Sequence, residues 1–242
     1  MAIVDKVRAH WPIDEDNDSI GEDIHSTWDL TDRNTLTSDT GKIGKCGKFI
    51  AYSQENIYAG SDDDFYDLQD GFGFSVWFKT ESTFDSNARR VLTKRNQYEI
   101  WRTSGYYGSS DLKIKVNKAS GNVTETLISG LGTNLWYFLY WGCDGSNLKY
   151  SVNGATLTTG GAISDYNTTS YKLEIGNWSG TGLTGRFWNS LIDEVTYWGS
   201  MLTQDEINSI YNSGSGLAYP FSGGDDSATM TQEYYRRLLG GQ

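Results

Sequence analysis

The chain has 242 residues, a length at which a large β-sandwich still forms a single domain. Its formal net charge is −11, with 31 acidic against 20 basic residues, so nucleic acid and anionic membranes are excluded as general partners. Its 14% aromatic content, including 9 Trp and 16 Tyr, excludes a disordered chain and predicts a substantial core.

The first residues, MAIVDKVRAHWPIDEDNDS, contain no apolar segment like that of a secretory signal, so we expect synthesis in a cytoplasm without a signal peptide. No apolar run reaches the ~18 residues that span a bilayer, and we expect no membrane insertion. Cys46 and Cys143 show neither metal-ligand spacing nor a disulfide pattern, which favours two buried free thiols.

Strand patterns dominate the rest of the chain. GFGFSVWFKT places Phe72, Phe74, Val76 and Phe78 on one face, and DLKIKVNKA alternates in the same way. LWYFLYWGC is apolar on both faces, as in a central strand. NLKYSVNG ends in Asn153-Gly154, which suits a tight turn because both positions tolerate positive φ. YKLEIGNW and RFWNSLIDEVTYW add two strands. Many short strands separated by turns predict an all-β sandwich or jelly roll.

One helix is predicted near residues 203–213. Thr203 and Glu206 form a capping box, and Leu202 and Ile207 have the spacing of a hydrophobic staple. Gly214 is placed to end this helix.

The composition changes after residue 219, which predicts a domain over 1–219 and a tail over 220–242. The tail begins as a polar linker and ends in TMTQEYYRRLLGGQ, a short amphipathic segment that would be marginal as an isolated helix. We expect it to be an attachment or oligomerisation element, although it could instead fold back on its own domain. Its candidate partner-binding residues are Tyr234, Tyr235, Arg236, Arg237, Leu238 and Leu239.

Four segments in order carry a resemblance: VRAHWPIDED, GKIGKCGKFI, DGFGFSVWFKT and LIDEVTYWGSMLTQDEINSIY. Together they resemble the laminin-G-like members of the concanavalin A-like lectin/glucanase superfamily, over roughly residues 7–219. The resemblance implies a jelly-roll sandwich of two antiparallel sheets, one of them concave. It does not choose among lectins, glycosidases and structural modules, which share this fold.

Asp193 and Glu194 stand side by side in the last of these segments. Adjacent side chains of a strand point to opposite faces, so this pair should not flank one glycosidic bond. The superfamily's retaining glucanases carry a spaced E-x-D-x-x-E set, which does not occur here, so we expect no enzyme activity. The resemblance implies instead that Asp193 binds a structural calcium ion, and Asp14 or Glu15 is a weaker candidate for a further ligand. The alternative is that Asp193 only accepts backbone N–H bonds.

Candidate ligand-binding residues lie in WRTSGYYGSSD, residues 101–111. Tyr106 and Tyr107 sit in a Gly/Ser-rich hairpin tip, and with Trp101 they could stack on sugar rings or bury at a protein interface. One of the tyrosines could equally pack back on the sandwich.

These features together predict a non-enzymatic binding or structural module. The resemblance and the absent signal favour a virion component of a tailed phage, either a capsid decoration or a tail or fibre appendage. We expect such a module to contact other virion proteins or copies of itself, and to bind host-surface polysaccharide. The alternatives are a bacterial carbohydrate-binding protein and, third, a glycoside hydrolase.

Overall fold

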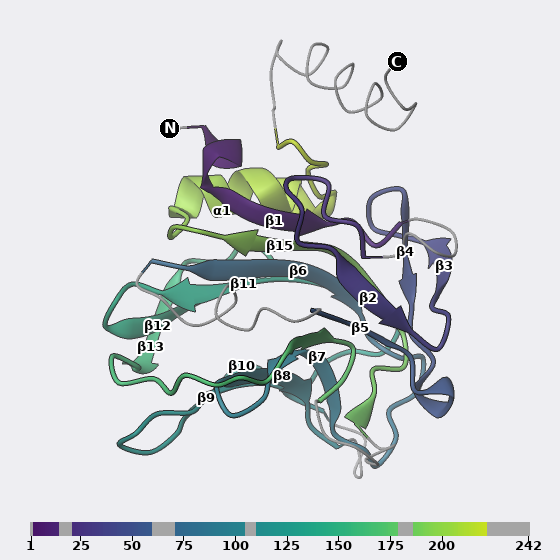
Figure 1. Ribbon diagram of the computed structural model, residues 1–242, viewed down its shortest axis with the longest axis horizontal. Coiled ribbons are helices and arrows are strands. Elements are labelled where there is room, and N and C mark those ends of the chain that lie inside the picture. The colour runs from purple at the N-terminus through teal and green to yellow at the C-terminus, as the bar shows by residue number, and fades with distance from the viewer. Residues whose placement is uncertain (1, 15–20, 60–70, 105–109, 179–185, 222–242) are drawn as a thin grey trace.

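The computed structural model describes residues 2–14, 21–59, 71–104, 110–178 and 186–221. Over these residues the chain forms a sandwich of two antiparallel sheets with one short α-helix on its outside (Figure 1). The all-β jelly-roll sandwich predicted from the sequence is confirmed. No helix within the described ranges is both long and apolar enough to cross a membrane.

Among the described residues, the first sheet has eight strands and the second has seven. The first follows the order β13 (Thr158–Ala162), β12 (Asn147–Val152), β11 (Trp136–Cys143), β6 (Gly73–Lys79), β15 (Leu191–Trp198), β4 (Lys45–Lys48) and β3 (Thr37–Thr40), and β1 (Val7–Trp11) also pairs with β15. The second follows the order β10 (Val123–Ile128), β9 (Leu112–Val116), β8 (Tyr98–Arg102), β7 (Arg89–Lys94), β14 (Leu173–Ile175), β5 (Asn56–Ala59) and β2 (Leu30–Arg33). The helical elements are η1 (Ile3–Lys6), η2 (Ala51–Ser53), α1 (Gln204–Tyr211) and η5 (Asn212–Gly214).

The main core lies between the two sheets and is rich in aromatic rings. Phe74 of β6 stacks on Tyr197 of β15 at a centroid distance of 4.8 Å and on Trp141 of β11 at 5.7 Å. Tyr98 of the second sheet meets the Trp141 ring at 5.0 Å, so the aromatic contacts join the two layers. The alternating sequence of β9 gives alternating burial, with Leu112, Ile114 and Val116 facing this core.

A second apolar cluster covers the outer face of the eight-stranded sheet. Trp77, Phe138 and Trp198 point outward from their strands and pack against Leu202, Ile207 and Ile210 beside and within α1, and Phe221 joins the same cluster. In β6 and β11 the residues that face the core and many of those that face outward are therefore apolar. This explains why both strand sequences are apolar on both faces.

The helix begins as the sequence predicts and ends earlier than expected. Thr203 Oγ1 accepts the Glu206 N–H at 3.3 Å, and Glu206 Oε2 accepts the Thr203 N–H at 2.7 Å, which completes the capping box. The helix ends at Tyr211, because Asn212 adopts the left-handed conformation with φ +48° and caps it. Gly214 is not the terminating residue; it lies in the following turn η5.

Cys46 and Cys143 are both buried in the sandwich and are not joined by a disulfide. Burial raises the pKa of the Cys46 thiol to about 12, with a smaller contribution from the nearby Asp193 carboxylate. Asn153 and Gly154 both have positive φ, at +51° and +69°, as the hairpin dipeptide requires.

Candidate functional site

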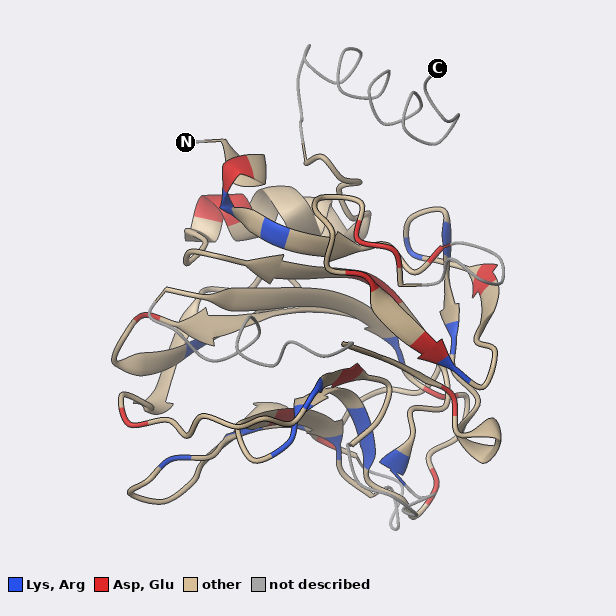
Figure 2. Ribbon diagram, in the orientation of Figure 1, with Lys and Arg blue, Asp and Glu red and all other residues tan. Residues whose placement is uncertain are grey.

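The outer face of the seven-stranded sheet differs from the covered face of the other sheet. Its strands alternate between core residues such as Ile100 and Ile114 and polar residues on the outside. Cross-strand pairing aligns one outward residue of each strand in a row: Thr124, Lys115, Glu99, Thr93, Glu174, Tyr58 and Thr31. Figure 2 shows basic residues along several strands of this sheet. We call this surface the polar face.

A ladder of alternating aromatic rings and guanidinium groups lies on the polar face. The guanidinium of Arg95 lies 4.6 Å from the centre of the Tyr171 ring and 4.8 Å from that of Trp178, and the guanidinium of Arg186 lies 4.1 Å from the Trp178 ring. The order is therefore Tyr171, Arg95, Trp178, Arg186. Such contacts contribute about 0.5–2 kcal/mol each and hold both partners in place.

Local backbone geometry brings Trp178 over the sheet. Gly176, directly after β14, has φ +82°, and a Cβ at this position would lie 2.4 Å from a ring carbon of Phe49. Only glycine fits such a turn against a neighbour this close. The Gly176 N–H donates to Val91 O and its carbonyl accepts the Trp188 N–H, so this turn is tied to β7 and to Trp188.

Buried polar groups surround Glu174 in the middle of the polar face. The side-chain amides of Asn177 and Asn56 donate to Glu174 Oε2 at 2.8 and 3.3 Å. The remaining oxygens of these amides, and Oγ1 of Thr93, are buried without a hydrogen-bond partner among the described residues. Burial raises the pKa of Glu174 above its ordinary value, while the nearby charge of Arg33 acts in the opposite direction. Unsatisfied buried oxygens of this kind indicate a site that a ligand or water completes.

A second charged group lies between the ladder and Trp101. Arg90 donates to Glu99 Oε2 at 3.0 Å, and Lys115 donates to Glu99 Oε1 at 3.0 Å. Burial alone would raise the pKa of Glu99, but these two cations outweigh burial and hold it below its ordinary value. The Arg90 guanidinium lies 5.9 Å from the Trp101 ring, so the aromatic ring and the ion pairs share one surface.

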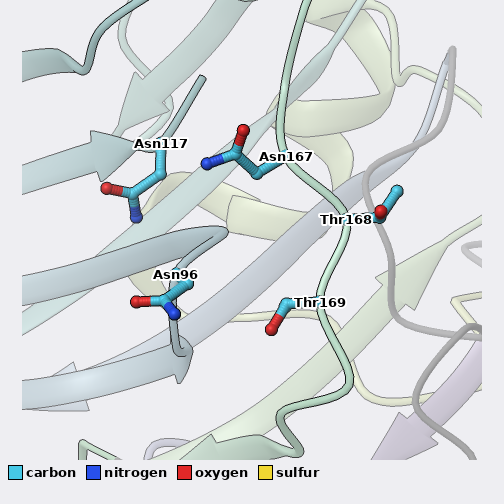
Figure 3. A pocket seen from close by; sticks show the side chains of 5 residues that line it. All are labelled: Asn96, Asn117, Asn167, Thr168 and Thr169. Carbon is cyan, nitrogen blue, oxygen red and sulfur yellow. The ribbon is translucent and has the colours of Figure 1, made fainter. Parts of the chain in front are cut away.

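A polar pocket of about 380 Å³ opens at the ends of β7, β8 and β9 (Figure 3). Its lining consists of amide and hydroxyl side chains: Asn96, Asn117, Asn167, Thr168 and Thr169. The pocket adjoins the ladder, because Asn96 follows Arg95 and Thr169 stands two residues before Tyr171. Amides and hydroxyls both donate and accept hydrogen bonds, so the lining suits a ligand rich in hydroxyl groups.

The structure places only part of the predicted ligand site. Trp101 lies on β8, half-buried on the polar face. Tyr106, Tyr107 and the predicted tail residues fall outside the described ranges. The sequence analysis missed Tyr58, Tyr171, Trp178 and Glu174. One available signal was the polar residue that interrupts each apolar alternation, such as Glu174 between Leu173 and Ile175.

The strand carrying Asp193 and Glu194 does not alternate as the sequence analysis assumed. Glu194 has φ +50°, and the pairing of β15 with β6 shifts between Asp193 and Thr196, which defines a β-bulge. The opposite-face argument against catalysis therefore fails at this position. Burial gives a better argument against catalysis. Asp193 and Glu194 are 0% and 8% exposed, so a polysaccharide cannot reach them.

Asp193 and Glu194 form an incompletely satisfied acidic site. Asp193 Oδ2 accepts the Lys42 N–H at 2.7 Å and the Ile43 N–H at 3.0 Å, whereas its Oδ1 is buried without a hydrogen-bond partner among the described residues. Glu194 Oε2 lies 3.3 Å from His10 Nε2 but lacks hydrogen-bond geometry. Burial lowers the pKa of His10 to about 3, so the neutral imidazole offers no compensating charge.

The donor chemistry of this site fits calcium. Burial raises the pKa of both Asp193 and Glu194, and the charge of Asp14 adds to the effect. A buried group of carboxylates with unused oxygens is favourable when a hard dication neutralises it. The described residues contain no group of three or more His, Cys, Asp or Glu arranged around a metal position, so backbone carbonyls or water would have to complete the shell.

Comparison with known proteins agrees with this architecture. A family model described as the concanavalin A-like lectin/glucanases superfamily matches residues 53–208. No curated protein matches the chain. Domain 4 of AbnA, a GH43 extracellular arabinanase from Geobacillus stearothermophilus solved with arabinotriose, is similar at a TM-score of 0.62 and 19% identity, covering 88% of this chain and 98% of that one.

Two toxin binding domains have the same fold. The binding domain of Paraclostridial Mosquitocidal Protein 1 gives a TM-score of 0.66 at 11% identity, covering 88% of this chain and 53% of that one. The binding domain of botulinum neurotoxin DC, solved in complex with SialylT, gives 0.61 at 14% identity, with coverages of 87% and 52%. The chain thus spans about half the length of these toxin domains. The family match extends over well more than half of the chain, and the chain therefore belongs to the concanavalin A-like lectin/glucanase superfamily.

Proposed function

We propose that the chain is a non-enzymatic carbohydrate-binding module and that its ligand lies across the polar face. One observation carries the proposal: this face combines the partly exposed rings of Tyr58, Tyr171 and Trp178 with an adjoining pocket lined by amide and hydroxyl oxygens. The outer face of the other sheet is filled by the α1 cluster. A sugar chain offers hydroxyl donors for such oxygens and apolar ring faces for aromatic side chains.

The similar structures support this class of ligand. Domain 4 of AbnA was solved with arabinotriose, and a botulinum neurotoxin binding domain with SialylT. These are properties of those proteins. They make a carbohydrate the first ligand to test on a related fold.

The carboxylates of the polar face favour binding over hydrolysis. Glu99 is held by Arg90 and Lys115, and Glu174 by two amides. A general acid or base needs a carboxyl group that is free to exchange a proton with the substrate. Both groups are instead engaged with neighbouring side chains.

Isothermal titration calorimetry with a panel of oligosaccharides, arabinotriose among them, tests the proposal. We expect Trp178→Ala to weaken binding by roughly tenfold or more, since a buried aromatic contact contributes at least ~1.4 kcal/mol. Tyr52→Ala is the matched control, because Tyr52 is 96% exposed on η2 and belongs neither to the ladder nor to the pocket lining. Failure of every sugar to bind, or unchanged binding by Trp178→Ala, would contradict the proposal.

We propose the virion of a tailed phage as the setting, with the C-terminal tail as the attachment element. The support comes from the sequence: Tyr234, Tyr235, Leu238 and Leu239 would form a costly exposed patch, and two arginines there complement an acidic body. Removing residues 222–242 should leave a folded, glycan-binding sandwich that no longer joins its particle or oligomer. Sedimentation of the truncated protein with its assembly would refute the attachment role.

We also propose that Asp193 and Asp14 contribute to one structural calcium site. The support is the unpartnered Asp193 Oδ1 beside the buried Glu194 carboxyl group. Bound calcium would neutralise these charges and tie β15 to the loop at Lys42 and Ile43. Its test is the first prediction of the Discussion.

A further inference from the structure

We infer that the pocket of amide and hydroxyl side chains beside the ladder determines which sugar the chain prefers, and that the sugar unit it accepts is neutral. This inference rests on the proposed carbohydrate-binding function and names the chemical class of ligand at one part of that site. Three observations support it: the uncharged lining of the pocket, the unused amides within it, and the hydrogen bonds that fix its backbone.

The lining of the pocket is uncharged. Among the described residues it consists only of amide and hydroxyl side chains. The charged side chains next to it have partners of their own: the Arg95 guanidinium lies over the rings of Tyr171 and Trp178, and Lys118 pairs with Asp165 at 3.1 Å. A carboxylate or ammonium group on a sugar would therefore lose water in the pocket without gaining an opposite charge. Hydroxyl groups regain hydrogen bonds from the amides, which favours a neutral sugar.

Three amides of the lining have unused hydrogen-bonding capacity. Within the described ranges, no hydrogen bond is made by the side chains of Asn96, Asn117 and Asn167. Asn117 and Asn167 are half-buried, and Asn96 is exposed at the turn between β7 and β8. The three amides come from three separate segments of backbone (Figure 3). Each amide offers one acceptor and two donors, so together they can bond several hydroxyl groups of one sugar ring.

Hydrogen bonds of the backbone hold these side chains in place. The Asn117 N–H donates to Gln97 O at 2.8 Å, and the Asn167 N–H donates to Asn117 O at 3.0 Å, which joins the three segments. The side chain of Gln97, which is fully buried, also donates to the Asn167 carbonyl at 2.8 Å. A pocket fixed in this way does not adapt to each sugar. An epimer with one hydroxyl group turned away would leave an amide unpaired, and the pocket therefore discriminates between epimers.

The size of the pocket suits a short part of a sugar chain. Its volume of about 380 Å³ is near the lower end of the roughly 300–1,000 Å³ found for small-molecule sites. The rest of the chain would lie along the ladder, which begins at Tyr171, two residues after Thr169 of the lining. Aromatic rings contact the apolar faces of many sugars, whereas amides distinguish the positions of their hydroxyl groups. The ladder would therefore contribute affinity, and the pocket would contribute selectivity.

Calorimetry on the full chain with four probes tests the inference: arabinotriose, isomaltotriose, mannotriose and the acidic trigalacturonate. We expect one neutral trisaccharide to bind at least about tenfold more tightly than the other two neutral ones, because a mismatched hydroxyl group leaves an amide unpaired. Trigalacturonate should bind at least about tenfold more weakly than the preferred neutral sugar, since the pocket supplies no cation for its carboxylates.

Side-chain truncations separate selectivity from affinity. Asn167→Ala and Asn117→Ala leave the backbone hydrogen bonds of the pocket available. Each should weaken binding of the preferred sugar by roughly tenfold and bring the affinities of the neutral sugars within about threefold of one another. Trp178→Ala should instead weaken binding of all neutral sugars by a similar factor and preserve their ranking.

Asn208→Ala is the matched control, because it removes the same amide from an exposed position of α1, on the outside of the other sheet. It should leave every affinity within about twofold of the wild-type value. Melting curves of all four variants establish that each remains folded.

The outcomes separate this inference from the proposed function. Equal binding of the three neutral sugars, lost in Trp178→Ala, would overturn the selectivity of the pocket and leave carbohydrate binding in place. A preference that persists in both Asn167→Ala and Asn117→Ala would do the same. Trigalacturonate binding as tightly as the best neutral sugar would overturn the neutral class of ligand. No binding of any probe would overturn both the inference and the proposed function.

Discussion

Calcium removal offers a direct test of the acidic site at the bulge of β15. Without a cation, the buried Asp193 and Glu194 carboxyl groups face each other's charge and that of Asp14, with only the neutral His10 nearby. A calcium ion bound only by the folded state stabilises that state by mass action. We therefore expect chelation with EDTA to lower the melting temperature.

The size of the effect follows from the donor set. Two or three carboxylates completed by carbonyls and water suit a site with a dissociation constant of about 10⁻⁴ to 10⁻³ M. At about 10 mM calcium the ion then adds roughly 1.4–2.7 kcal/mol to the free energy of unfolding. For a domain of this length, each kcal/mol moves the melting temperature by about 2–4 °C. The expected difference is thus about 3–11 °C.

Differential scanning calorimetry in calcium and in EDTA measures that difference. Asp193→Asn keeps a side-chain oxygen for the Lys42 and Ile43 N–H groups but loses the charge, and should melt at the same temperature in both buffers. Asp39→Asn, which removes an exposed carboxylate paired with Lys48, should keep the full response. A wild-type melting temperature that differs by less than about 1 °C between the buffers would refute the reasoning.

Three further predictions concern other parts of the chain. Burial would raise the pKa of Asp85, but hydrogen bonds from Arg89 and other neighbours hold it below its ordinary value of 3.8, so its contribution to stability is present above that pH and lost on acidification. Asp85→Asn should flatten the fall of melting temperature measured between roughly pH 4 and pH 2. Iodoacetamide at mildly alkaline pH should label neither Cys46 nor Cys143 in the folded protein and both after unfolding, as judged by mass spectrometry; labelling of the native form would show that the thiols are accessible. Incubation with β-glucan or arabinan should release no reducing sugar, and release abolished by Glu174→Gln would establish an enzyme instead.

The sequence predicted correctly those elements whose conformation depends on residues close together in the chain, such as a helix cap or a tight turn. Thr203 and Glu206 make the expected capping box, because both partners lie within one helical turn. Asn153 and Gly154 take the positive φ values that their turn requires. The end of the helix was mispredicted because Asn212 also tolerates the left-handed conformation and comes first in the chain.

The site depends on contacts between distant residues, which local rules do not reach. Arg95 and Trp178 are far apart in the sequence, and Trp178 follows a turn at Gly176 that packs closely against Phe49. The bulge at Glu194 was equally hidden, since an alternating sequence does not show where strand pairing slips by a residue. The sequence shows which charged residues lie on strands. It does not show that strand pairing aligns them in one row across the sheet.

The positions of the first and last described segments have a practical meaning for how such a module is displayed. Ile3 and Phe221 both pack in the α1 cluster, on the side of the sandwich opposite to the polar face (Figure 1). A linker or neighbouring domain joined directly before Ile3 or after Phe221 would therefore leave from behind the sheet that we propose binds sugar. Copies strung together or anchored on a support can then engage one polymer simultaneously, and modest single-site affinities would multiply into avidity.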